Sequence, residues 1–270
     1  MSGRRAKKAR SAERARPAHL KNAETVRRTA EAVLSVDLSD LRLRNRVPQV
    51  VVGLCRAAFA QSAVIATLTA NGMSSSASPN RRLFLEAALR LHWLRGLTRD
   101  DRRRAVDTML AKDRKDTNGT LAYLAKVGQE ADFDPSEMNE FYLDSAETGA
   151  VQEQARKLDA AVKSTEVEPW SIYAMWREET KHAHPSATLA GEYAPTFDDA
   201  HLSSGEPDPM DPNLEAHSLV QQLIVMTTGW LLSDEQVPHE IANRITVAYF
   251  ASSPLQVWPD VTSGEETTSS

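Results

Sequence analysis

The sequence contains a single cysteine, Cys55, among 270 residues. A disulfide framework is therefore impossible, and a reducing cytoplasm is the compartment that we expect. Cys55 lies inside the longest apolar run of the chain, where a lone thiol is expected to be a small core residue. No apolar segment follows the basic start of the chain, so we expect no secretory signal.

The sequence also lacks an unbroken apolar segment of the length that a bilayer requires. Its longest apolar run, residues 47–70, is interrupted by Pro48, Gln49, Gly53, Arg56 and Gln61. This run is too polar for a membrane span, so we expect a soluble protein without a membrane partner.

Strand-like alternation, internal repeats and glycine-rich phosphate loops are missing, whereas helical periodicity is nearly continuous. The sequence therefore predicts an all-α fold, a single multi-helix bundle. Thr98 with Asp101 predicts the start of a basic, exposed helix that holds Arg102, Arg103 and Arg104. The other predicted helices cover residues 22–35, 48–70, 79–95, 121–130, 136–163 (with a possible break at Gly149), 169–184, 213–232 and 238–250.

The predicted bundle, residues 21–251, lies between a basic disordered arm, 1–20, and a disordered tail, 252–270. Within it, a long proline-rich loop occupies residues 185–212, directly after one of the predicted helices. Loops of this length in compact domains are often lids or binding elements, and are otherwise disordered.

Charge is distributed unevenly along the chain, which is acidic overall with a formal net charge of −5. In residues 1–20, Glu13 is the only acidic residue among seven basic ones: Arg4, Arg5, Lys7, Lys8, Arg10, Arg14 and Arg16. Such an arm can hold RNA phosphates by releasing counterions, and it equally fits a solvated, disordered terminus. The acidic remainder argues against nucleic-acid binding across the folded surface.

The best site candidate is a polar stripe on the helix that Pro185 ends. At about 100° per residue, one edge of this helix carries Tyr173, Arg177, Thr180 and His184. These side chains suit neither a solvated face nor a core, so the stripe predicts a binding or catalytic site. A simpler alternative for His182 and His184 is that cationic side chains favour the dipole at a helix end.

A second charged row lies on the predicted helix 79–95, which is otherwise apolar nearly all round and is therefore expected to be buried. Arg82, Glu86 and Arg90 recur every four residues along it. This row is either the exposed edge of a buried helix or one side of a cleft. In the second case Glu86 is expected to orient His184 or Arg177.

These positions carry two resemblances. Arg82-x3-Glu86, followed by Tyr173-x6-Thr180-x3-His184-Pro185-Ser186, is similar to a family of bacterial all-helical proteins of uncharacterised function, over about residues 45–250. More loosely, Arg177-x4-His182 or Arg177-x6-His184 resembles the motif of HEPN helical-bundle ribonucleases of bacterial defence and toxin systems. The second resemblance implies metal-independent RNA cleavage by a homodimer. Arg177, His182 and His184 are then the expected catalytic residues, and Arg82, Glu86, Tyr173 and Thr180 the expected binding residues.

Metal binding is disfavoured by a missing partner motif. Glu179-x-x-His182 has the spacing of half a di-iron site, but such sites need a second Glu-x-x-His and two further carboxylates. The sequence contains no second copy, so we expect neither a metal nor another cofactor. Two hypotheses remain: a HEPN-like ribonuclease of a defence or stress system, and a non-catalytic module that binds a partner or small anion through its charged stripe.

Overall fold

The computed structural model describes residues 17–41, 45–130, 143, 149–165, 170–194, 205 and 212–253. Helices and their connections account for these residues, and no strand occurs among them. The predicted all-α bundle is therefore confirmed for the described part of the chain. The basic arm up to residue 16 and the tail from residue 254 lie outside it.

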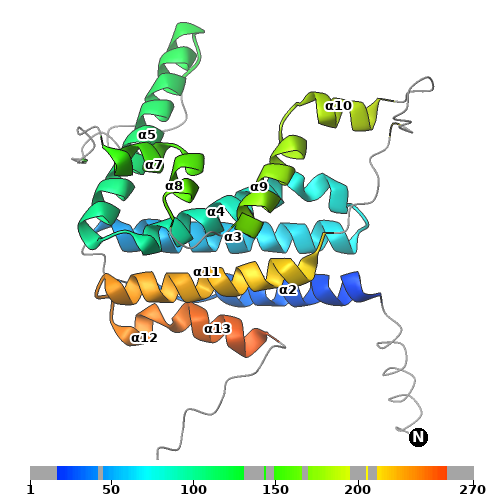
Figure 1. Cartoon of the computed structure of the whole chain (residues 1–270), viewed down its shortest axis with the longest axis horizontal. Coiled ribbons are helices and arrows are strands. Elements are labelled where there is room, and N and C mark those ends of the chain that lie inside the picture. The colour runs from blue at the N-terminus through cyan, green and yellow to red at the C-terminus, as the bar shows by residue number, and fades with distance from the viewer. Residues whose placement is uncertain are drawn as a thin grey trace, which may run out of the picture.

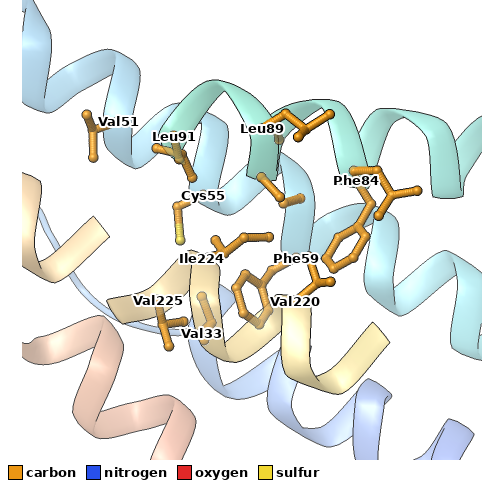
Figure 2. Packing of buried hydrophobic residues seen from close by; sticks show 14 of the residues in the cluster. Val33, Val51, Cys55, Phe59, Phe84, Leu89, Leu91, Val220, Ile224 and Val225 are labelled. Carbon is orange, nitrogen blue, oxygen red and sulfur yellow. The ribbon is translucent and has the colours of Figure 1, made fainter. Parts of the chain in front are cut away.

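Four long helices form the body of the molecule: α2 (Ala18–Leu34), α3 (Arg46–Ala70), α4 (Ser78–Gly96) and α11 (Leu214–Asp234). In Figure 1, α3 and α4 lie above α2 and α11, and the short helices α12 (His239–Ala242) and α13 (Arg244–Ser252) lie below. Figure 2 shows the apolar core between the long helices, in which Phe59 of α3 and Phe84 of α4 pack near Ile224 of α11.

The remaining helices cover the other side of α3 and α4. They are α5 (Arg99–Lys126), α7 (Ala150–Arg156), α8 (Leu158–Lys163), α9 (Trp170–Ala183) and α10 (Ala187–Tyr193), with a 3-10 turn at Ser74–Ala77. α9 packs against α4, whereas α5 projects from the bundle (Figure 1). Its buried residues all precede Met109, and residues as late as Tyr123 are well exposed.

Four helices, α3, α5, α10 and α11, begin with a side-chain cap. Asn45 caps α3 by accepting a hydrogen bond from the amide of Val47, and Thr98 caps α5 by accepting one from Asp101. α2 differs, because it begins at Ala18 after Pro17, so Asn22 lies inside the helix and is not its cap. Residues 18–20 accordingly belong to the bundle rather than to the arm.

Three further boundaries differ from the sequence prediction. α5 is one continuous helix through the region predicted as two. Residues 149–163 form two short helices separated at Lys157. The proline-rich loop contains α10, which Ser186 starts by accepting a hydrogen bond of 3.1 Å from the amide of Leu189. The rest of this loop lies almost wholly outside the described residues.

Arg102 is not exposed, contrary to its prediction. Its side chain is 2% exposed, forms an ion pair with Asp234 and lies 3.2 Å from a carboxylate oxygen of Glu235. Both acids end α11, and Glu235 also accepts a hydrogen bond of 3.1 Å from Asn45. A buried arginine therefore fastens the start of α5 to the end of α11.

α3 is a core helix. Cys55 is fully buried there, as predicted, and burial raises the pKa of its thiol to about 12. Among the described residues, α3 alone is long and apolar enough to cross a membrane. α3 packs on α2, α4 and α11, and a core helix of this kind has the same length and hydropathy as a membrane-spanning one. This property is therefore weak evidence for a membrane span.

The body also contains neutral polar pairs. Gln221 of α11 accepts a hydrogen bond of 3.0 Å from Thr29 of α2, and His217 shares one of 2.9 Å with Ser62 of α3. His217 stacks on Phe84, with ring centroids 3.9 Å apart. Burial lowers the pKa of His217 to about 3, and the charge of Arg81 contributes, so the imidazole is neutral at physiological pH.

Candidate functional site

The two helices that carry the predicted site residues, α4 and α9, lie against each other. Their strongest polar link is between Arg81 and Glu179, whose Nε and Oε1 atoms are 2.6 Å apart in an almost buried ion pair. Arg81 also donates to the carbonyl of Ser74 at 2.7 Å and to the hydroxyl of Ser78 at 3.0 Å. This pair anchors α9 on the body.

Sequence reasoning missed Arg81 and Glu179. One signal was available, because Arg81 precedes the core residues Phe84 and Ala88 by three and seven positions, the spacing of one helix face. Its neighbour Arg82 lies on a different face, where its guanidinium is 5.5 Å from the centre of the Trp176 ring of α9.

The predicted row on α4 forms an ion-pair ladder. Glu86 lies 3.7 Å from Arg82 and 3.9 Å from Arg90, and Arg90 donates to the carbonyl of Ala155 in α7 at 2.8 Å. Burial lowers the pKa of the Arg90 guanidinium. Among the described residues, no ion pair joins Glu86 to Arg177 or His184. The ladder therefore attaches α4 to its neighbours, and the expected orientation of a catalytic group by Glu86 is not seen.

The predicted stripe on α9 is divided between structural and exposed residues. Tyr173 donates a hydrogen bond to Asp159 of α8, and Asp159 also pairs with Lys163 at 2.6 Å. These hydrogen bonds, with Lys163 as the larger cause, lower the pKa of the Asp159 carboxyl. The Thr180 hydroxyl donates to the carbonyl of Trp176 at 2.7 Å, within its own helix.

Arg177 is an exposed residue of the stripe, and its side chain contacts Tyr173. Its Nη1 lies 3.5 Å from the Tyr173 hydroxyl, and its guanidinium lies 6.0 Å from the centre of the same ring. The hydrogen bond to Tyr173 raises the pKa of Arg177 further. A neutral phenol therefore holds an exposed guanidinium in place.

The two histidines differ in their surroundings. His182 is mostly buried between two carboxylates, with Nδ1 3.0 Å from Glu192 of α10 and Nε2 3.9 Å from Glu178. His184 lies just beyond the end of α9 and is exposed. His182 thus helps to attach α10, which leaves Arg177 and His184 accessible on one edge.

No group of three or more His, Cys, Asp or Glu side chains within the described ranges is placed to hold a metal ion. Comparison of the chain with models of known protein families, with curated proteins and with solved structures gave no significant match. Function is therefore inferred from the residues and their geometry alone.

Proposed function

We propose that the protein binds an anionic partner through the exposed edge of α9 formed by Arg177, Lys181 and His184, here called the α9 edge. The observation that carries this proposal is the environment of Arg177. Other arginines near α9 are used in ion pairs or packing, as Arg81 and Arg82 are. Arg177 has a phenol as its partner and forms no ion pair with a carboxylate among the described residues.

The chemistry of this edge suits a phosphate. A guanidinium offers paired N–H donors that match two phosphate oxygens, and Tyr173 limits its freedom before binding. Lys181 adds a cation one turn further along, although Glu178 lies 2.6 Å from it in an exposed pair. Because Arg177 is more than one turn from the end of α9, the unfavourable dipole of the helix C-terminus has little effect there.

RNA is the polyanion that we propose as the ligand. A flexible strand can contact the α9 edge and the basic arm at the same time, and the arm would supply much of the salt-sensitive affinity. The compartment that we propose is the cytoplasm. The arm can be tested separately, because deleting residues 1–16 leaves α2, which begins at Ala18, intact.

HEPN-like RNA cleavage is the second candidate. The observation that favours it is that Arg177 and His184 are both exposed on one edge, since an exposed imidazole can exchange a proton with a 2′-hydroxyl. Seven residues of helix separate them by about 10 Å along the axis. The arrangement that we propose for cleavage is a homodimer in which Arg177 meets the partner's copy of His184.

Binding of a labelled single-stranded RNA, measured by fluorescence anisotropy, tests the first proposal. Arg177→Ala should weaken binding about tenfold, as expected for a lost charge-assisted hydrogen bond. The control is Arg27→Ala, which removes the same charge from an exposed arginine of α2 that is paired with Glu31. Equal losses in both variants would show that only net charge matters and would overturn the α9 edge.

The same RNA, followed on a denaturing gel, separates binding from cleavage. Cleavage that persists in EDTA and disappears in His184→Ala would support the ribonuclease. RNA that is bound yet left intact at high protein concentration would exclude the ribonuclease and leave the binding proposal standing.

A further inference from the structure

A hollow of about 580 Å³ lies at the end of the body where α2 and α11 begin. The two helices run in the same direction, because Ala18 and Leu214, their first residues, line the same hollow and Thr29 pairs with Gln221 further along (Figure 1). The residues that line the hollow are Ala18, His19, Asn22, Thr69, Gly72, Ser74, Pro212, Asn213, Leu214 and Glu215.

The backbone makes this hollow electropositive. Each helix N-terminus carries the equivalent of about half a positive charge on its first amides, and two such ends meet here. α2 has no side-chain cap and no acidic residue in its first turn, so nothing in that turn offsets its dipole. The buried guanidinium of Arg81, although paired with Glu179, donates to the carbonyl of Ser74 in the wall.

A buried hydroxyl in the wall lacks a partner. Thr69, at the end of α3, is 4% exposed, and its Oγ1 makes no hydrogen bond with any described residue. Thr67, two residues earlier, is exposed and donates to the carbonyl of Ala63 at 2.8 Å, as threonines in helices commonly do. A buried hydroxyl without a partner is unfavourable, and a ligand that accepts from it would remove this cost.

We propose that this hollow binds the oxyanion group, phosphate or carboxylate, of a small molecule. The first amides of α2 and α11 would donate to the oxyanion, as helix N-termini do in many anion sites. Asn22 and the Thr69 hydroxyl would donate from the wall, and His19 lies at the exposed rim. The volume is in the range of small-molecule sites. The site is separate from the α9 edge and does not depend on RNA binding.

Glu215 is the feature of the hollow that opposes an anion. It is an exposed acid in the first turn of α11, where it favours the helix dipole. A ligand at this site would therefore bind more weakly than the two helix ends alone would allow. Because the charge of Glu215 opposes an anion, removing that charge should strengthen anion binding.

The test is titration of the full-length protein with inorganic phosphate and, separately, with acetate, followed by amide chemical shifts in NMR. At least one of the two should shift the amides of Ala18, His19 and Leu214 saturably, and the tighter of the two identifies the oxyanion. No saturable shift with either would overturn the proposal.

Charge variants give changes of opposite sign. Glu215→Gln should tighten binding about fivefold, whereas Asn22→Asp should weaken it by at least that factor, because a unit charge about 4 Å away contributes about 1 kcal/mol even in water. Both changes suit a helix, so the fold should persist. Affinities that both variants leave unaltered would exclude an anion in the hollow.

Thr69→Val tests the buried hydroxyl, and Thr67→Val on the same helix is its matched control. Thr69→Val should weaken binding severalfold without lowering stability, since it removes a hydroxyl that has no partner in the unbound protein. Thr67→Val should leave binding unaltered. Equal affinities in the two variants would overturn the assigned role of Thr69.

Discussion

The body and α9 are held by different forces. In the body, α2, α3, α4 and α11 share an apolar core, and two of their buried polar contacts are neutral pairs, Gln221 with Thr29 and His217 with Ser62. α9 contributes one buried side chain to that core, Ile172, among its described side chains. Its remaining attachment comes largely from Arg81, Arg82 and aromatic contacts.

This difference separates the roles of polar residues in the two regions. The neutral pairs in the body specify how the helices pack and carry no net charge. On α9, some charged side chains attach the helix and others face solvent. Adjacent residues also differ: the Thr180 hydroxyl bonds within the helix, whereas Lys181 is exposed. A helix attached in this way is also expected to open before the body does.

The largest expected effect is on the body. Phe59→Ala removes a fully buried ring from the core and should lower the free energy of unfolding by about 3–5 kcal/mol. Val64→Ala, on an exposed position of the same helix, should cost less than about 0.5 kcal/mol. Urea denaturation measures both. A small loss for Phe59→Ala would contradict a tightly packed core.

The next effect falls on α9. Arg81→Ala leaves Glu179 without its partner, and breaking such a buried pair costs about 3–5 kcal/mol; we expect the lower end, because α9 can move and rehydrate the carboxylate. Hydrogen exchange should show lost protection in α9 and unchanged protection in α3. Arg82→Ala, whose partner Glu86 is 27% exposed and lies 3.7 Å away, should cost less than about 1 kcal/mol. Uniform loss of protection would mean that α9 belongs to the same cooperative unit as the body.

The smallest effect is the pH dependence of stability between pH 6.5 and 5, to which His217 contributes about 2 kcal/mol. His217 has a folded pKa of about 3, below its unfolded value of about 6.5, so the unfolded chain binds more protons between these values. Its contribution to stability is complete above about pH 6.5 and is lost as the pH falls towards 3, by up to about 1.4 kcal/mol per pH unit. His217→Gln should show a smaller slope between pH 6.5 and 5. Identical slopes would mean that His217 does not titrate as its burial requires.

The sequence predicted the helices better than the partners of their side chains. Periodicity and capping residues located α3, α4 and α11 because these signals are local. The sequence prediction missed that α5 is continuous and began a separate helix at residue 121. It also missed α10, because the prolines of residues 185–212 favoured a loop.

Partners across helices could not be predicted in the same way. The packing of α4 on α9 brought Arg82 beside Trp176, but which arginine would be buried depended on the crossing of the two helices. Arg102 was read as exposed because its neighbours are, and the acids that bury it lie more than a hundred residues away. The hollow at the start of α2 and α11 has no sequence motif, because it forms where residues far apart in the sequence meet.

The half of α5 that projects from the bundle is a suitable place for a spectroscopic label. Beyond Leu110, its side chains contribute little to the core, yet the helix is continuous with the segment that Arg102 fixes to α11. A fluorophore or spin label placed near Lys115 would thus follow the tumbling of the whole particle while leaving its packing untouched. Distances measured from that point could report where a bound strand of RNA lies.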